Sequence, residues 1–307
     1  MPHLYSNDQL RRYFEHIGLG SDFDLAQEPS LSLLTKLQTR HMVRVPFESL
    51  SLHYSRHRLL SLDPEDLFKK IVENGRGGYC MEVNAFFATV LRSLGFRLYS
   101  AGARVKGPSG YKGWDHMVNI VTINGERYLV DVGFGSNGPT HPIPLHDGVE
   151  FDGVPPARGR LQYRKLDEHT DPNQRVWLYA VQAADREDSS SAWRDMYHFV
   201  ETEFLPEDFE VMNLATMTAP QSFFVQSVMC MCTILDEQEE RPVGLLILHR
   251  DYVKRRVGGE AGIIELFETE EQRVAALKKY FGIVLSAEEK KAIRGLASEI
   301  RSKENHA

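Results

Sequence analysis

The spacing of apolar residues changes at Phe96, and this change constrains the fold more than any other feature of the sequence. Before Phe96 apolar residues recur every three or four positions, which is the period of an amphipathic helix. After Phe96 apolar and polar residues alternate, as they do along a strand. We therefore expect an α+β fold. The first unit, 1–95, is expected to be helical, and strands are expected to follow it.

Capping-box pairs mark where several helices begin. In such a pair a Ser or Thr side chain bonds the helix start, and a Gln or Glu three residues later bonds back. Ser6 with Gln9 and Ser286 with Glu289 have this spacing. The expected helices lie at 7–17, 31–42, 64–72, 270–280 and 287–300.

The composition is that of an ordinary globular protein. The chain has 307 residues, of which 42% are hydrophobic and 26% charged, so a sizeable core is expected. The net charge of −7 argues against nucleic acid as a partner, and the short basic run at 254–256 is expected to be an exposed turn. We find neither a run of 18 apolar residues nor a signal-peptide pattern, so we expect no membrane partner and a cytoplasmic location.

The chain has three cysteines, Cys80, Cys230 and Cys232, which are too few for a disulfide framework. In the cytosol their thiols should be reduced. Cys230 and Cys232 lie two positions apart on an apolar run, and a metal site there would need further Cys or His ligands. We therefore expect two core thiols and no bound metal.

Cys80 follows a glycine-rich loop and opens an apolar run. Gly75, Gly77 and Gly78 supply backbone that can adopt positive φ, and the run after Cys80 predicts a buried helix ending at Gly95. The free N–H groups and the positive dipole end of a helix N-terminus favour a thiolate and can stabilise an oxyanion. Cys80 is therefore a candidate nucleophile. The alternative is a small buried thiol behind an ordinary glycine turn.

Asn124 and Gly125 separate two alternating runs and predict a hairpin with a two-residue type I′ turn. Counting back from that turn places His116 and Asp131 on one face of the sheet as diagonal cross-strand neighbours. At that separation a carboxylate can hydrogen-bond an imidazole. A three-residue loop would put the two side chains on opposite faces, so the expectation depends on the turn.

Together Cys80, His116 and Asp131 supply a nucleophile, a base and a group that orients the base, which is the logic of a catalytic triad. Each has an ordinary explanation when taken alone. A histidine on a half-buried strand is usually a satisfied polar residue, and an aspartate at a strand end usually belongs to a turn. The combination favours nucleophilic catalysis through a cysteine.

Three segments carry a resemblance to the arylamine N-acetyltransferase family. They are 76–82 (RGGYCME), 116–119 (HMVN) and 131–135 (DVGFG), and the likeness extends to 45–50 (VPFESL) and 213–224. The resemblance implies a helical bundle over 1–95, a β-barrel over 96–210 and an α/β lid over 211–307, with a papain-like triad of Cys80, His116 and Asp131. It also implies a ping-pong transfer of an acyl group from coenzyme A, through Cys80, to an aromatic amine or hydrazine. The pattern is weakest over 137–200, which we interpret as barrel strands and loops with a polar tract at 185–191.

The resemblance also implies which residues contact the substrates. It assigns acyl-CoA contacts to Lys112, Gly113, Thr218 and Ser222, although Lys112 is alternatively a solvated loop lysine. It places Phe47 and Phe134 in the acceptor pocket, although each is alternatively plain core. Arg76 is expected to hold its own loop by pairing with Glu48 rather than to contact substrate.

The sequence leaves the acyl donor open. Acetyl-CoA is our default, and malonyl-CoA is the alternative, because the family includes N-malonyltransferase-like enzymes in fungi. A malonyl carboxylate would need a nearby cation, and the sequence does not indicate which. Asp115 departs from the small or apolar residue that often precedes the histidine in this family. Two further alternatives are a papain-like or transglutaminase-like enzyme that acts on amides, and a binding protein without activity.

Overall fold

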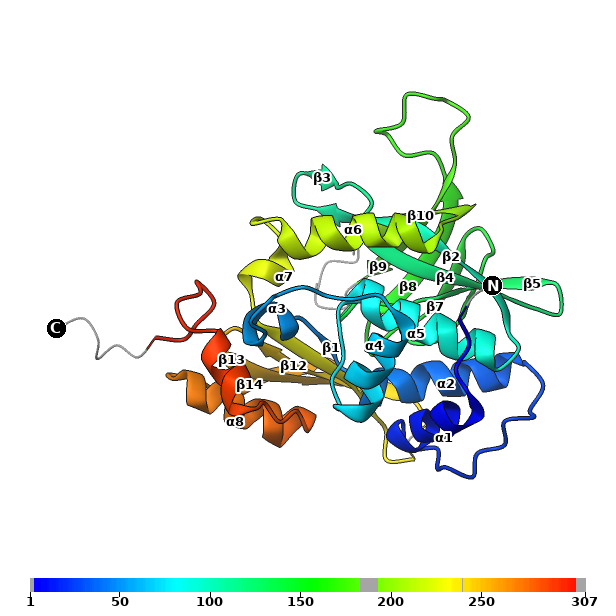
Figure 1. Cartoon of the computed structure of the whole chain (residues 1–307). Helices are drawn as coiled ribbons and strands as arrows, with labels where there is room; N and C mark the ends of the chain where they lie inside the picture. The colour runs from blue at the N-terminus through cyan, green and yellow to red at the C-terminus, as the bar shows by residue number, and fades with distance from the viewer. Residues whose placement is uncertain (1–2, 183–192, 239, 302–307) are drawn as a thin grey trace.

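The computed structural model describes residues 3–182, 193–238 and 240–301. The N-terminal part of the chain is helical, as its apolar period predicts, and both α1 and α2 begin at serine N-caps. The Ser6–Gln9 capping box is formed. Both helices share a buried apolar cluster with α5, the helix that begins at Cys80 (Figure 1). The helical elements are α1 (Asn7–His16), α2 (Leu31–Arg44), α3 (Ser51–Tyr54), α4 (Pro64–Phe68), the π-helical η1 (Lys69–Glu73) and α5 (Cys80–Ser93).

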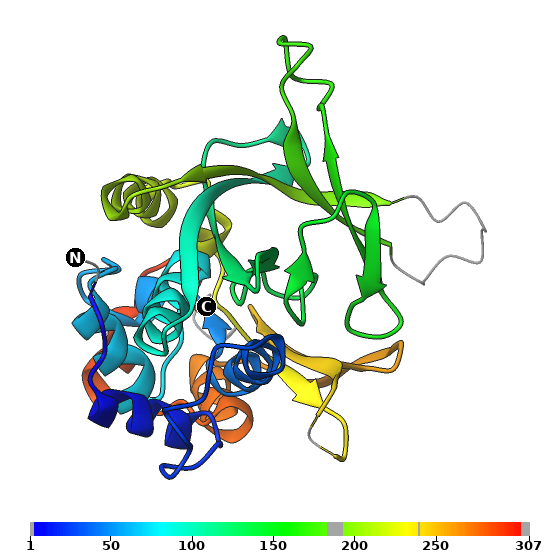
Figure 2. The same ribbon diagram turned by 90° about the vertical axis from the view of Figure 1, so that its right-hand side faces the viewer.

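The middle of the chain forms a nine-stranded sheet that curls into a nearly closed barrel (Figure 2). Its strands are β2 (Arg97–Gly107), β3 (Gly110–Tyr111), β4 (His116–Ile123), β5 (Glu126–Val130), β6 (Ile143–Pro144), β7 (Val149–Asp152), β8 (Arg158–Arg164), β9 (Val176–Gln182) and β10 (Arg194–Glu203). They are ordered β6-β5-β4-β2-β10-β9-β8-β7, and β3 pairs with β2. The polar tract at 185–191 lies outside the described residues. The α+β class expected from the sequence is confirmed.

A five-stranded sheet in the order β1-β11-β12-β13-β14 completes the described fold. Its strands are β1 (Phe47–Glu48), β11 (Met229–Leu235), β12 (Pro242–His249), β13 (Tyr252–Val257) and β14 (Glu260–Leu266). The accompanying helices are α6 (Pro206–Thr218), α7 (Phe223–Gln226), α8 (Glu270–Phe281) and α9 (Ala287–Ala292). Because β1 belongs to the helical part of the chain and pairs with β11, this sheet joins segments from both ends of the sequence.

Two local expectations were wrong. The basic run at 254–256 is not an exposed turn but the middle of β13, paired with β12 on one side and β14 on the other. The helix after Ser286 ends at Ala292 instead of reaching Ile300. Gly295 adopts a φ of +82°, which a right-handed helix cannot include, so the chain turns there.

The predicted hairpin is present with the predicted register. Asn124 and Gly125 have φ values of +51° and +85°, as a type I′ turn requires, and Ile123 pairs with Glu126. The ladder continues to the pair of Asn119 and Val130. The turn therefore brings the start of β4 alongside the residue that follows β5.

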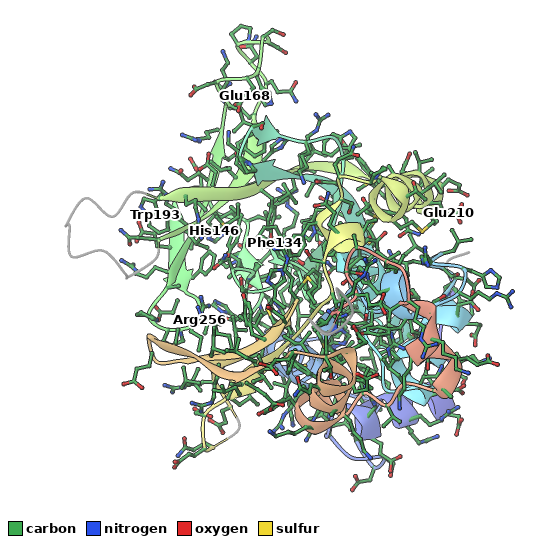
Figure 3. The ribbon with its side chains drawn as sticks, turned by 90° about the vertical axis from the view of Figure 1, so that its left-hand side faces the viewer. Phe134, His146, Glu168, Trp193, Glu210 and Arg256 are labelled. Carbon is green, nitrogen blue, oxygen red and sulfur yellow. The ribbon has the colours of Figure 1, made fainter. Side chains whose placement is uncertain are left out.

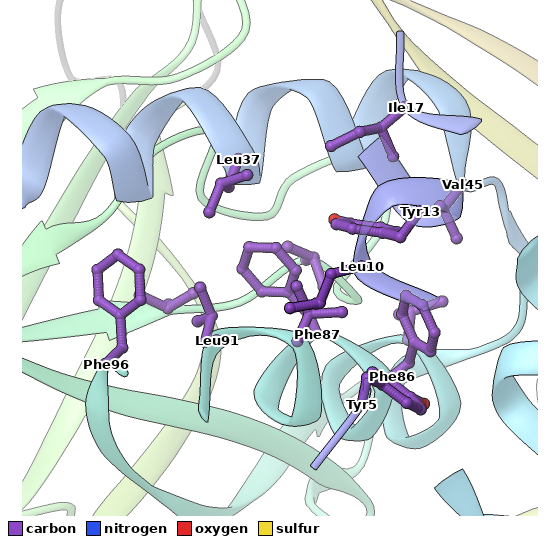
Figure 4. Packing of buried hydrophobic residues seen from close by; sticks show 14 of the residues in the cluster. Tyr5, Leu10, Tyr13, Ile17, Leu37, Val45, Phe86, Phe87, Leu91 and Phe96 are labelled. Carbon is purple, nitrogen blue, oxygen red and sulfur yellow. The ribbon is translucent and has the colours of Figure 1, made fainter. Parts of the chain in front are cut away.

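The largest cluster of buried apolar residues lies between the N-terminal helices and the barrel. Figure 4 shows Phe86 and Phe87 of α5 facing residues of α1 and α2, and the rings of Phe86 and Tyr13 lie 5.5 Å apart. Val121 and Val130, from β4 and β5, belong to the same cluster. Burial of this apolar surface holds α5 against the hairpin and so fixes where the start of α5 lies.

The three parts of the structure meet near Phe134. In Figure 3 Phe134 lies at the centre of the molecule, whereas Glu168 on the β8–β9 connection and Glu210 on α6 lie at its periphery. Among the described residues, none of the helices has both the length and the apolar character needed to cross a membrane.

We predict that Gly125→Ala lowers the free energy of unfolding by about 1–2 kcal/mol, because alanine is disfavoured at positive φ. Chemical denaturation measures the change. Gly262→Ala on β14 is the matched control: Gly262 does not have a positive φ, and an added Cβ would meet no heavy atom within 4 Å. Equal effects of the two substitutions would contradict the role assigned to the turn.

Candidate active site

Cys80 is the first residue of α5 and is buried beside a tightly packed loop. Gly75 alone of the three loop glycines adopts positive φ, so the expectation for the other two was wrong. Glycine is required at positions 77 and 78 because a side chain at either position would clash with neighbouring atoms. A Cβ on Gly77 would lie 1.7 Å from the carbonyl oxygen of Pro46, and one on Gly78 would lie 2.6 Å from the Glu82 side chain.

His116 and Asp131 are hydrogen-bonded in a site that solvent barely reaches. His116 Nε2 lies 2.8 Å from Asp131 Oδ2, and each residue is only 1% exposed. The Cys80 side chain lies close enough to the His116 ring to raise the pKa of His116, and the Cys80 sulfur contacts the Asp115 carbonyl oxygen at 3.7 Å. Because Asp131 occupies Nε2, Nδ1 is the ring nitrogen left for the sulfur. The structure therefore brings the three predicted residues together in the order Cys80, His116, Asp131.

The charge of Asp131 determines the protonation of His116. Burial alone would lower the pKa of His116, but the Asp131 carboxylate and the hydrogen bonds to Asp131 and Cys80 raise it to about 10. Burial would raise the pKa of Asp131, but the imidazolium and two N–H donors hold it below its ordinary value. At neutral pH the histidine is therefore an imidazolium between a carboxylate and the sulfur.

Asn84 fixes the Asp131 carboxylate and was missed by the sequence analysis. Its Nδ2 donates to Asp131 Oδ1 and to the Met117 carbonyl, both at 2.9 Å, and its Oδ1 accepts from the Val132 N–H at 3.0 Å. The Gly133 N–H donates to the same carboxylate oxygen at 2.9 Å. The available signal was a polar residue one turn after Cys80 on the same face of a mostly apolar helical run.

A buried group of charges supports the loop before Cys80. Glu48 Oε1 lies 3.4 Å from Arg76 Nε and accepts from the Gly77 N–H at 3.2 Å. Burial would raise the pKa of Glu48, but Arg76, Lys70 and two backbone N–H groups lower it. Glu82, in the first turn of α5, accepts from the Tyr79 N–H and pairs with Lys70. Arg76 thus holds the loop, as expected.

A cavity of about 640 Å³ opens beside Cys80 and His116. Phe47, Phe134, Lys112, Gly113 and Ser222 line it, as the sequence analysis expected of residues that contact substrates. Thr218 is not among the lining residues, and its hydroxyl donates to the Leu214 carbonyl at 2.6 Å. The lining residues that the sequence analysis did not assign include Trp114, Ser136, Phe224, Met231, His249 and Tyr252.

The other two cysteines lie away from this cavity. Cys230 is buried, and burial raises its pKa well above the ordinary value. Burial also raises the pKa of Cys232, to about 12, so both stay thiols. Within the described ranges no group of three His, Cys, Asp or Glu side chains could hold a metal ion.

The chain is similar in sequence to N-acetyltransferases and N-malonyltransferases. The model of the N-acetyltransferase family matches residues 30–290. The chain is 39% identical over 327 aligned residues to N-malonyltransferase FDB2 of Fusarium pseudograminearum, an alignment that covers 98% of this chain and 94% of the relative. It is 30% identical to arylamine N-acetyltransferase 2 of Mus musculus, covering 90% of this chain and 94% of the relative.

A solved structure has the same fold. The Mycobacterium marinum arylamine N-acetyltransferase, determined in complex with CoA, matches with a TM-score of 0.74 and 26% sequence identity. The match covers 92% of this chain and 99% of the mycobacterial chain. The arrangement of helices, barrel and five-stranded sheet is therefore one that a known CoA-binding enzyme also adopts.

We predict that Asp131→Asn slows alkylation of Cys80 by iodoacetamide about tenfold or more at neutral pH. Without the carboxylate, burial lowers the His116 pKa, and once that pKa lies below the pH each further unit reduces the imidazolium population tenfold. Peptide mass spectrometry measures the labelling rate. Asp115→Asn removes a neighbouring carboxylate that also lines the cavity and is the control. Unchanged labelling in Asp131→Asn would refute the coupling.

Proposed function

Because the chain belongs to the arylamine N-acetyltransferase family and is an acyl-CoA-dependent N-acyltransferase, we propose that Cys80, His116 and Asp131 are its catalytic triad. The observation that carries the proposal is the hydrogen bond between His116 and Asp131 beside a cavity that Cys80 and His116 both line, with Cys80 close enough to raise the pKa of His116. The helical part of the chain, 1–95, supplies the nucleophile. The barrel part, 96–210, supplies the base and the carboxylate, and 211–307 closes the cavity.

In the proposed first half-reaction the Cys80 thiolate attacks the thioester carbonyl of acyl-CoA. The bond between that carbon and the Cys80 sulfur forms, the bond to the CoA sulfur breaks, and the leaving CoA thiolate takes the proton from His116 Nδ1. The N–H groups at the start of α5 face the developing oxyanion. The products are free CoA, an acyl-Cys80 thioester and a neutral imidazole.

In the proposed second half-reaction an amine attacks the acyl-Cys80 carbonyl. The carbon–nitrogen bond forms, the carbon–sulfur bond breaks, and neutral His116 accepts the proton from the nitrogen. Cys80 leaves as the thiolate, which restores the starting pair. Because aromatic side chains such as Phe47 and Phe134 line the cavity, an arylamine bound there displaces water from the neighbourhood of the thioester.

We place the two substrates in the cavity that Cys80 lines. Lys112, Gly113 and Ser222 are the proposed acyl-CoA contacts, with Lys112 as a point charge for a phosphate. We assign no contact to Thr218, because its hydroxyl is already bonded and it does not line the cavity. The proposed acceptors are small aromatic amines and hydrazines.

The aromatic side chains around Cys80 suit such acceptors. Phe47 and Phe134 both line the cavity, and the Phe134 ring lies edge-on to His116 with the ring centroids 5.2 Å apart. An arylamine that packs against these rings would present its nitrogen near the Cys80 thioester. This placement supports the assignment of both residues to the acceptor pocket.

We further propose malonyl-CoA as the acyl donor in place of the acetyl default. The relative named an N-malonyltransferase is 39% identical over nearly the whole chain, against 30% for the arylamine N-acetyltransferase of Mus musculus. Two cations could meet the malonyl carboxylate in the cavity: Lys112, on its lining, and the His116 imidazolium. Acetyl-CoA is the competing donor.

The proposed setting is the cytosol, where the three free thiols would stay reduced. Nucleic acid is not a proposed partner, because the chain carries a net charge of −7. The acyl-CoA thioester and the amine acceptor are the partners that the proposal requires.

We predict that incubation with malonyl-CoA adds one malonyl group to the intact protein and that Cys80→Ala abolishes the adduct. The malonyl and acetyl adducts differ by the mass of carbon dioxide, so intact-mass spectrometry after separate incubations identifies the donor. Cys232→Ala is the control, because its thiol does not line the cavity. An acetyl adduct alone would refute malonyl transfer and leave acyl transfer standing.

Release of CoA completes the test. We expect it to exceed one equivalent only when an arylamine such as an anisidine is present. Sustained thioester loss without amine, or cleavage of a peptide amide without CoA, would favour the hydrolase alternative. The absence of any adduct would favour a binding protein without activity.

A further inference from the structure

His53 is a fully buried histidine whose two ring nitrogens are both hydrogen-bonded, and it takes no part in the proposed chemistry. It lies on α3, its Nε2 lies 2.9 Å from the Phe224 carbonyl oxygen, and its Nδ1 lies 2.8 Å from Ser298 Oγ. Burial lowers the pKa of His53 to about 4, so the ring is neutral at physiological pH. The ring therefore carries a single N–H.

The chemistry of the two partners fixes the tautomer. A carbonyl oxygen can only accept, so the proton lies on Nε2 and is donated to Phe224. Nδ1 is then an acceptor, and the Ser298 hydroxyl must donate to it. The result is one directed chain of hydrogen bonds, from Ser298 through His53 to the backbone of α7.

Ser298 is itself held in place by a buried arginine. Arg273, 1% exposed, donates from Nη2 to the Ser298 carbonyl at 2.9 Å and pairs with Glu270. The Ile300 N–H donates to Glu270 Oε2 at 3.2 Å. Residues 293–301, here called the C-terminal latch, are therefore anchored to α8 on one side and to α3 on the other.

At the far end of this series of hydrogen bonds, Phe224 lines the cavity next to Cys80. Its ring is 5.9 Å from that of Phe47 and 5.2 Å from that of Tyr79, the residue before Cys80, as measured between ring centroids. Phe224 lies on α7, which is only four residues long. A helix of one turn has little stability of its own, so external bonds such as that from His53 fix how far the Phe224 ring enters the cavity.

We propose that the C-terminal latch sets the acceptor end of the cavity through the Ser298–His53–Phe224 chain. Ser298 and His53 are then positioning residues for acceptor selection, and Phe224 is the wall that they place. The proposal rests on the proposed function, because it assigns the acceptor to that part of the cavity. It extends the site to a segment more than 200 residues from Cys80 in the sequence.

The Ser298–His53–Phe224 hydrogen bonds affect the second half-reaction, in which the amine reacts, and not the first, in which Cys80 is acylated. Among the described residues, the hydrogen bonds of the His53 ring and of Ser298 go to each other, to Phe224 and to Arg273, and not to Cys80, His116 or Asp131. The bonds that prepare the thiolate are therefore intact when the latch is loosened. A ping-pong enzyme allows the two half-reactions to be measured separately, so the two effects can be distinguished.

The test compares Ser298→Ala with Ser298→Thr, which keeps a hydroxyl donor, and with Glu299→Ala. Glu299 is the matched control, because it lies in the latch but its side chain bonds the Gly295 N–H and Arg301, which belong to the latch itself. The rate of acylation is measured by intact-mass spectrometry after each variant is mixed with the acyl-CoA that acylates the unsubstituted protein. Discharge is followed by mixing the acyl-enzyme with a small arylamine and with one carrying a bulky para substituent.

We expect Ser298→Ala to raise KM for the small arylamine about fivefold, as loss of one hydrogen bond would, and to narrow the discrimination between the two amines. The acylation rate should stay within about twofold, the scatter expected of a distant substitution. Ser298→Thr and Glu299→Ala should both have the KM and the discrimination between the two amines that the unsubstituted protein has. Hydrogen exchange of the backbone amides of residues 222–227 should become faster in Ser298→Ala only. This measurement tests the latch independently of turnover.

The proposal would be overturned if Ser298→Ala and Glu299→Ala had the same KM values for the two amines. It would also be overturned if Ser298→Ala slowed acylation and left the discrimination between the two amines unchanged. Unchanged exchange over 222–227 in Ser298→Ala would also overturn it. Failure of the parent protein to form any acyl-Cys80 is a different result, because it overturns the proposed function on which the latch rests.

Discussion

The hydrogen bond between His116 and Asp131 is the interaction on which the site depends, because it keeps two charges in a place that water barely reaches. Burying a charge is costly unless it is paired and hydrogen-bonded. Asn84 and the Gly133 N–H supply the remaining bonds to Asp131, and Cys80 lines the same cavity as the imidazole. The helix, the hairpin and the loop after it must all hold their positions for this pairing to persist.

Much of this arrangement could be predicted because it is encoded locally. Asn124 and Gly125 are a strong turn signal, and a two-residue turn fixes the register of both strands, which sets the faces of His116 and Asp131. The start of α5 at Cys80 likewise follows from a glycine loop and an apolar run that lie next to each other in the sequence. The pairing of Arg76 with Glu48 was expected from the resemblance and is present.

What the sequence did not reveal depends on contacts between distant segments. Asn84 looked like one polar residue in a helix, and only the approach of β4 and β5 gives its amide three partners. The basic run at 254–256 has the composition of a turn, but strands on both sides make it the middle of a sheet. Nothing near Phe224 in the sequence indicates that its carbonyl is held by His53. Propensity is a weak guide where tertiary pairing decides.

The two-residue strand β1 has a consequence for how the protein is made. Phe47 forms a bridge to Gly78 on one side and pairs with Met231 on the other, so β1 joins the loop that presents Cys80 to β11, a strand that lies far downstream in the sequence. During translation the N-terminal helices can pack early, because their contacts are close in sequence. The nucleophile loop, in contrast, gains its full support only after the ribosome has released the β11 segment. A nascent chain therefore carries its reactive sulfur for most of its synthesis without the finished pocket around it.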